Sequence, residues 1–336
     1  MSPKPPIRLF SAALACVLGT ASPARAAVEA VDMRDRGVWD VASENDVYGG
    51  WGDRYYTNGM RLAYVSPDML APGARERAST LRWFGGAAHE IYAPHDRYSA
   101  VPPEGDHPYS AWLYATGGLA WADASSLDLF TLNAGVVGPS ALGEPVQNNY
   151  HRFIGVKPLN GWDSQLRDEP GVNVAWVRVW RVTLARGGSS WGAQLLPRAG
   201  GEAGTVRTRA FAGAQLRFGV NLPDDFGEMR MREGLTGAAP ASFVRRTDSR
   251  LAPDSWYVFV DAQGEARARN MALDGNLWHD SRSVDSKPFV GQFSAGVAAH
   301  WGAARVALSQ MVRTREFAGQ EDDPFVYGAL TVTVAH

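Results

Sequence analysis

The sequence has little cysteine, no long apolar run beyond its start, and almost no net charge. Its 336 residues contain one cysteine, Cys16, which excludes a small secreted fold that depends on disulfides. After residue 26, no segment approaches the roughly 18 continuous apolar residues that a transmembrane helix needs. The formal net charge of -2 implies no basic face for a nucleic-acid partner. Stability must therefore come from burial or from a closed hydrogen-bond network.

The N-terminus is the one place where apolar residues gather in a row. A basic segment ends at Arg8, an apolar stretch then runs to about Leu18, and Ala24-Arg25-Ala26 follows. This order of basic, apolar and small residues predicts a secretory signal peptide over residues 1–26. Its removal would leave a chain without cysteine.

Glycine and aromatic residues are plentiful, and the dominant pattern after residue 26 is alternation. In "TVRTRAFAGAQLRFG", residues 205–219, one face carries Val206, Ala210, Ala212, Ala214, Leu216 and Phe218, and the other carries Arg207, Arg209, Gln215 and Arg217. A charged face opposite an apolar face over more than ten residues is typical of a membrane barrel strand, with lipid outside and a polar lumen inside. A periplasmic β-sandwich, whose strands are shorter, is the alternative.

The sequence predicts an all-β fold, a transmembrane antiparallel β-barrel of about 12 strands that occupies residues 27–336 as one domain. The predicted strands are 37–45, 58–66, 80–92, 110–121, 127–137, 172–185, 190–198, 205–219, 256–269, 287–301, 304–316 and 325–335. An even count puts both ends in the periplasm and the connections 46–57, 93–109 and 138–171 outside the cell. The link 220–255 is long for a periplasmic turn, and a missed strand pair there would change the count.

The first hairpin carries polar residues at its tip. Strict alternation places Glu44 and Asp46 on the lumen side of the first strand, and Thr57 and Arg61 on the lumen side of the second. Asp46 and Thr57 should therefore approach one another at the outer rim. Asn45 has outward parity, so its place in a site would need a bulge or a bend.

The third outer connection supplies a histidine. In "GEPVQNNYHRFIG", Pro145 and Gly155 predict a short helix from about 145 to 154, which puts Gln147 and His151 on one face. The other side offers three residues for packing: Val146, Tyr150 and Phe153. A solvated loop with a surface histidine is the alternative to a catalytic site.

Several ordered motifs carry a resemblance. The segments "ENDVYGGWGDRYYTNGMRLAY", "EIYAP", "DHPYSAWLYA", "GVVGP", "GEPVQNNYHRFIG" and "GWDSQLRDEPG" are similar to those of the LpxR family of outer-membrane lipid A deacylases, from about residue 38 to 180. The resemblance implies a twelve-stranded barrel in the Gram-negative outer membrane. It also implies removal of the 3'-linked acyloxyacyl group of lipid A at the outer leaflet, with calcium and a histidine-activated water.

Site roles follow from matched positions within this resemblance. His151 would be the general base, with Gln147 as an amide one helical turn before it. Asn45, Asp46 and Thr57 would line the site from the first hairpin. Imidazole suits the role because its ordinary pKa lies near ambient pH.

The metal site departs from the family's pattern. Lys157 stands where members of the family can carry a glutamate. Calcium takes oxygen ligands, so either Asp163 or Glu169 replaces that glutamate and holds calcium together with Asp46, or this site binds metal differently. A loop-ordering hydrogen bond is the alternative role for both of the latter acids. The basic residue that the resemblance implies for a substrate phosphate is also not evident, because the second outer loop offers Arg97 and little else.

These observations predict a lipid A ester hydrolase, a monomer in the outer membrane with lipopolysaccharide as its substrate. An outer-membrane phospholipase would use the same base and calcium chemistry and is one alternative. A catalytically silent barrel or passive channel is the other, although Arg207, Arg209 and Arg217 with acidic partners could largely fill the lumen.

Overall fold

Antiparallel strands make up most of the computed structural model, which describes residues 28–49, 52–70, 79–187, 190–234, 242–246, 253–322 and 324–336. The predicted signal peptide, residues 1–26, lies outside the described residues. Among those residues, no helix has both the length and the hydropathy needed to cross a membrane.

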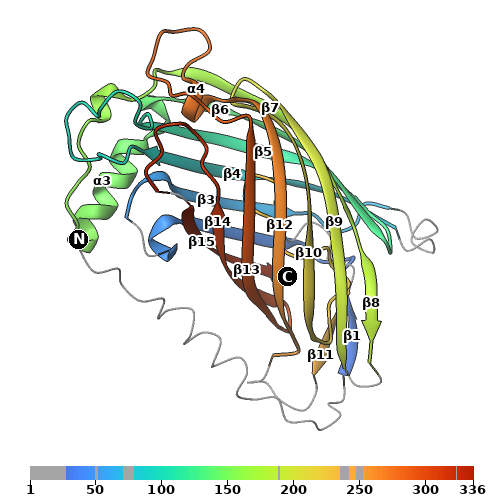
Figure 1. Cartoon of the computed structure of the whole chain (residues 1–336). Helices are drawn as coiled ribbons and strands as arrows, with labels where there is room; N and C mark the ends of the chain where they lie inside the picture. Colours follow the sequence, from blue (N-terminus) through green and yellow to red (C-terminus); the bar gives the residue numbers. More distant parts are fainter. Residues whose placement is uncertain are drawn as a thin grey trace.

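The main sheet closes on itself (Figure 1). It contains 13 strands, of which β8 (Val182–Arg186) pairs with β9 beside the ring, so twelve form the barrel. These are β2 (Val38–Asn45), β3 (Tyr55–Val65), β4 (Thr80–Ala93), β5 (Ser110–Ala122), β6 (Ser126–Val137), β7 (Glu169–Trp180), β9 (Trp191–Gly204), β10 (Arg207–Val220), β12 (Ser255–Asn270), β13 (Phe289–Trp301), β14 (Ala304–Arg313) and β15 (Phe325–Ala335). The pairing of β15 with β2 completes the ring.

The twelve-stranded antiparallel barrel is thus confirmed, and three short strands lie outside its ring. The predicted strand 172–185 ends at Trp180, and β8 follows as a separate strand. Two short strands were not predicted, β1 (Val28–Asp32) and β11 (Ser242–Arg246), which pair with each other. β11 lies within the long link 220–255 but belongs to this separate sheet, so the barrel count does not change.

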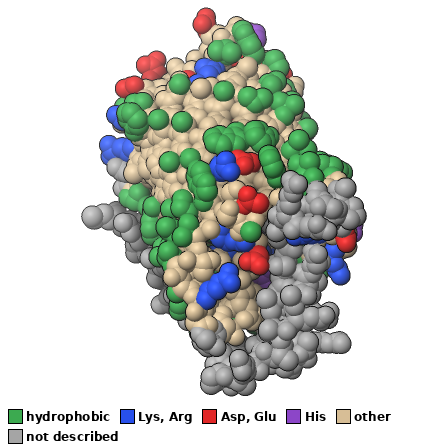
Figure 2. Space-filling model, turned by 90° about the vertical axis from the view of Figure 1, so that its right-hand side faces the viewer, with side chains coloured by type: hydrophobic (Ala, Val, Ile, Leu, Met, Phe, Trp, Pro, Cys, Tyr) green, Lys and Arg blue, Asp and Glu red, His purple; other side chains and the backbone are tan. Residues whose placement is uncertain are grey.

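Alternation divides the barrel wall into an apolar outside and a polar inside. Figure 2 shows apolar side chains spread over one side of the molecule. Large apolar side chains are exposed on the outer face of strands all around the barrel, among them Trp39, Met60, Trp83, Leu119, Phe130, Leu132, Val174, Phe218, Val260, Phe293 and Leu308. In β10 the predicted inward arginines are buried, and Leu216 and Phe218 point outward. Val206 differs from the prediction, because it precedes β10 and is buried.

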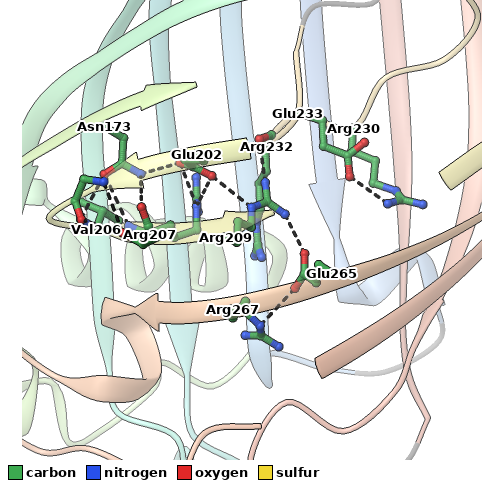
Figure 3. Close-up of polar contacts among 12 residues, drawn as sticks. Asn173, Glu202, Val206, Arg207, Arg209, Arg230, Arg232, Glu233, Glu265 and Arg267 are labelled. Atoms are coloured by element: carbon green, nitrogen blue, oxygen red, sulfur yellow. Dashed lines mark hydrogen bonds and ion pairs between the residues drawn. The ribbon is translucent and has the colours of Figure 1, made fainter. Parts of the chain in front are cut away.

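Ion pairs fill the lumen. Arg207 donates to both carboxylate oxygens of Glu90 across the barrel, at 2.7 and 3.1 Å. Arg209 bonds Glu202 at 3.1 Å and Glu265 at 2.7 Å (Figure 3). Buried charges are tolerated in this interior because each lies against an opposite charge.

Part of the long link after β10 also enters the barrel. Residues 225–234, here called the lumen segment, lie among the inward side chains of the strands (Figure 3). The Met231 N–H donates to Glu44 at 2.9 Å, and its carbonyl accepts from Arg61 at 2.9 Å. Arg209 bonds the carbonyl oxygen of Arg232 at 2.9 Å. The lumen segment therefore connects strands on opposite sides of the barrel.

Candidate active site

Helix α3 (Gly143–Ile154) lies against the outside of the barrel wall, at the same end of the barrel as the first hairpin (Figure 1). In β4, the neighbours of Ile91 bond inside the lumen, so Ile91 itself points outward. Ile91 and its outward-facing partner Ala111 are nevertheless buried, because they pack with Leu159 and Trp162 of the α3 connection. A Cβ at Gly143 would lie 2.6 Å from the Ala111 Cβ, so the helix needs glycine at this contact.

The helix buries its polar face. It begins two residues before the predicted start and ends as predicted, with Gly155 in the left-handed region at φ 74°. Gln147, Asn148 and His151 are the buried residues of its middle. Asn148 bonds both the N–H and the carbonyl of Leu159, which fixes the chain that returns from the helix.

The opposite face of α3 is exposed, so the predicted packing of its apolar side was wrong. Val146, Tyr150 and Phe153 are 42%, 53% and 87% exposed. The helix is attached to the barrel through its polar residues.

His151 has a defined proton position. Its Nδ1 lies 2.9 Å from the carbonyl oxygen of Lys157, and because a carbonyl only accepts, Nδ1 carries the proton. Nε2 lies 2.9 Å from Gln147 Nε2 and 3.2 Å from Asp53 Oδ1, and in the neutral imidazole it carries the lone pair. Lys157 thus contributes its backbone at the position where the resemblance implies a glutamate. A base with this tautomer can take a proton at Nε2.

The first hairpin delivers its polar residues to the same place. Asp46 opens a 3-10 helix (Asp46–Gly49), is fully buried, and accepts the Arg54 N–H at 2.7 Å. The Thr57 hydroxyl lies 3.4 Å from Asp46 Oδ1 and 3.4 Å from Asp53 Oδ1. Asp53 in turn accepts from Gln147 of α3 at 2.6 Å. Asp46, Thr57, Gln147 and His151 therefore form one connected group around Asp53.

A β-bulge changes the side on which Thr57 lies. The register of β3 with β4 shifts between Tyr56 and Asn58, so Thr57 is the extra residue. Tyr56, and not Thr57, takes the lumen side, where its hydroxyl donates to Glu44 at 2.8 Å. The predicted lumen position of Thr57 was wrong, because strict alternation does not count an extra residue.

Asp53 was missed as a site residue. In the sequence it stands in a glycine-rich turn, and its backbone is left-handed at φ 53°, as a turn residue's can be. Only the contact with α3, 94 positions later in the chain, distinguishes it from a solvated turn residue. No local signal in the sequence gives that contact.

The electrostatics of the site centre on Asp46. Burial raises the pKa of the Asp46 carboxyl well above its usual range. The backbone N–H of Arg54 opposes this shift, and the negative charge of Asp53 adds to it. Two acids are therefore held close together in a buried place, where a cation would be favoured.

The other predicted residues lie apart from this group. Asn45 uses its amide oxygen within the turn, where it accepts the Val47 N–H at 2.8 Å. Asp163 is exposed in a 3-10 helix (Trp162–Ser164). Glu169 is buried and accepts the N–H groups of Leu277 and Trp278 at 2.8 Å each, and His279 Nδ1 lies 3.0 Å away. Glu169 therefore orders the connection that follows β12.

The donor set of the site fits calcium in its chemistry. Asp46, Asp53, Thr57 and the amide carbonyl of Gln147 offer hard oxygen atoms, which calcium prefers. Within the described ranges, no three or more His, Cys, Asp or Glu side chains form a ready metal cluster. Any calcium here would thus rely on hydroxyl, amide or backbone oxygens besides the two acids.

Two cations flank one aromatic ring next to the group. The Arg97 guanidinium lies 4.9 Å from the centre of the Tyr98 ring, and Lys157 Nζ lies 4.6 Å from it. The charge of Arg97 acts on Asp46 and favours its ionised form. Arg97 of the second outer loop thus places positive charge beside Asp46 and Asp53 of the first hairpin.

Comparisons with known proteins agree with this architecture. The structure of LpxR from Salmonella typhimurium is similar at a TM-score of 0.71 and 22% identity, over 88% of this chain and 99% of that chain, a likeness in fold. The β-domain of the Bordetella autotransporter BrkA covers 89% of this chain and 98% of its own at 11% identity, but its TM-score of 0.42 is too low to support an argument. No curated protein sequence matches. The family model described as "Outer membrane protein LpxR" matches residues 10–336, and the chain belongs to the LpxR family.

Proposed function

We propose that this protein is an outer-membrane lipid A deacylase that hydrolyses the 3'-linked acyloxyacyl ester, with His151 as the general base and with calcium. Membership of the LpxR family supports the substrate and the reaction. The observation that carries the proposal for the base is the fixed tautomer of His151, whose Nε2 meets Gln147 and Asp53 at the outer rim.

The steps assigned to this chain are proton transfers and positioning. Nε2 of His151 takes a proton from a water molecule while the water oxygen attacks the ester carbonyl carbon. The bond from that carbon to the sugar oxygen then breaks, and the proton on Nε2 passes to the leaving oxygen. The products are a fatty acid and a lipid A hydroxyl. Asp53 stabilises the imidazolium between these transfers, because its carboxylate lies 3.2 Å from Nε2.

Thr57 and Gln147 orient this assembly. The hydroxyl of Thr57 lies 3.4 Å from a carboxylate oxygen of each acid and donates to one of them at a time, and the amide of Gln147 links Asp53 to His151. Asp46, Asp53 and Thr57 are the residues proposed to hold calcium, which would supply positive charge where the oxyanion develops. We assign Glu169 no metal role because backbone N–H groups occupy its oxygens, and Asp163 none because it is exposed.

The lumen gives reason to prefer an enzyme over a passive channel. The lumen segment and the ion pairs around Glu265 occupy the interior (Figure 3), together with the ion pairs of Glu90 with Arg207 and Arg232. A wide aqueous pore needs an open lumen.

Purified protein in mixed micelles tests the reaction. We expect acyl release from lipid A in calcium, little in chelator, and a loss of about 100-fold or more for His151→Gln, since general base catalysis contributes about 10²–10⁴. Glu144→Gln, an exposed position on the same helix, should keep the wild-type rate. Release of fatty acid from glycerophospholipid but not from lipid A would replace the proposal with a phospholipase. No release from either substrate would reject an esterase.

A further inference from the structure

The outward side of α3 is a surface that the reaction does not use. Five apolar residues lie on it and form what is here called the apolar face of α3: Leu142, Val146, Tyr150, Phe153 and Ile154. They are 42% to 87% exposed, with Phe153 the most exposed of the large apolar side chains in the described residues. Their spacing of three and four positions places them along one side of the helix. The helix therefore turns Gln147, Asn148 and His151 toward the protein and these apolar residues away from it.

The barrel wall indicates what meets this face. α3 covers the upper part of the outer face of β4 and β5, where Ile91 and Ala111 are buried. Farther along the same outward faces, Trp83 and Leu119 are exposed, and Phe130 and Leu132 are exposed on the neighbouring β6. These residues belong to the wall of an outer-membrane barrel, where acyl chains contact them. The apolar face of α3 therefore lies on the same outer side of the barrel as these lipid-facing residues.

Basic residues at the end of the helix fit the same surroundings. Arg152, which directly precedes Phe153, and Lys157, which follows the end of the helix, are both exposed. Apolar residues on one side with arginine and lysine beside them are typical of a helix that lies in a membrane interface and meets anionic headgroups.

We propose that the apolar face of α3 is seated among the acyl chains of the outer leaflet. The opposite face of the helix then holds His151 at the depth of the lipid ester groups. On the proposed function, the substrate reaches the site sideways from the leaflet, without leaving the membrane. The occupant of the face is thus the lipid of the leaflet itself.

Fluorescence quenching tests the location directly. Phe153→Cys is labelled with an environment-sensitive dye in a protein that also carries Cys16→Ala, and is reconstituted into phosphatidylcholine and phosphatidylglycerol vesicles. Leu132→Cys, on the outer wall, is the lipid-facing control, and Glu104→Cys, exposed in the second outer loop, is the water-facing control. Each is exposed to a phospholipid with a nitroxide on its acyl chain and, separately, to aqueous iodide.

We expect the label at 153 to be quenched by the nitroxide lipid as strongly as the label at 132, and to be protected from iodide. Quenching like that at 104 would overturn the proposal, because the face would then meet water. Protection from both quenchers would overturn it as well, because a second copy or another protein would then cover the face. This readout does not need activity. Lipid quenching in a protein that releases no acyl chain would keep the location and reject the proposed function.

Discussion

Replacing Asp53 with asparagine removes the negative charge nearest to His151 while the side chain keeps its size. Asp53 Oδ1 lies 3.2 Å from His151 Nε2, and Asp53 is 7% exposed. If His151 becomes an imidazolium during the reaction, this pair attracts by about 1.3 kcal/mol at the dielectric constant of water and about 5 kcal/mol at an effective value of 20. Each 1.4 kcal/mol corresponds to about tenfold in rate. Asp53→Asn should therefore lower kcat by at least about tenfold.

The assay is acyl release from lipid A in mixed micelles at saturating calcium, with initial rates over a range of substrate concentrations. Glu144→Gln on the exposed side of α3 is the matched control and should leave the rate within about twofold, as surface changes usually do. A calcium titration separates the two roles proposed for Asp53. Recovery of the full rate at high calcium would show that Asp53 acts through the metal alone. A wild-type rate for Asp53→Asn at every calcium concentration would refute both roles.

Three further predictions follow from the fold. Gly143→Ala should lower activity by up to about 100-fold in the same release assay, because the new Cβ meets Ala111 and displaces α3. Gly264→Ala is the control and should keep the wild-type activity, because a Cβ there has open space. Equal rates for the two variants would contradict the packing of α3 on the barrel. Glu90→Gln should lower the free energy of unfolding by about 3–5 kcal/mol in urea titrations, because Arg207 loses its buried partner. Glu321→Gln, a largely exposed acid, should change it by less than about 0.5 kcal/mol, and similar midpoints for the two variants would argue against the lumen network. In planar bilayers the wild-type barrel should show no steady current, because the lumen is filled, and a sustained porin-like conductance would contradict that arrangement.

The barrel could be predicted because its two environments impose a period of two over most of each strand. Lipid outside and ion pairs inside place the arginines of β10 on one side and Leu216 and Phe218 on the other. The pairing of β1 with β11 gives no such signal, because these strands are short and far apart in the chain. The entry of the lumen segment is equally hidden, since its partners lie on β2, β3 and β10.

The candidate site shows the same division. Asp46, Gln147 and His151 could be proposed from the sequence, because a hairpin tip and a helical spacing of four place them locally. Asp53 could not, since its role depends on a contact between the hairpin and α3. Thr57 was assigned the wrong side because a single extra residue in β3 is invisible to alternation.

The environment of the apolar side of α3 was predicted incorrectly, and the reason is physical. We expected that Val146, Tyr150 and Phe153 could pack on the side of the helix away from Gln147 and His151. On the outside of a membrane barrel, the apolar environment lies away from the protein, so the polar face of a helix is the one that turns inward. The buried Gln147 and His151 agree with that inversion.

The most direct test of the proposed function is mass spectrometry of lipid A from Gram-negative cells that express the wild-type protein or His151→Ala in the outer membrane. The account predicts that only cells with the wild-type protein lose one 3'-linked acyloxyacyl group, and that chelation of calcium in isolated membranes abolishes the loss. Unaltered lipid A in both strains, with the protein folded and inserted, would contradict the deacylase. The same loss with His151→Ala would contradict the proposed base.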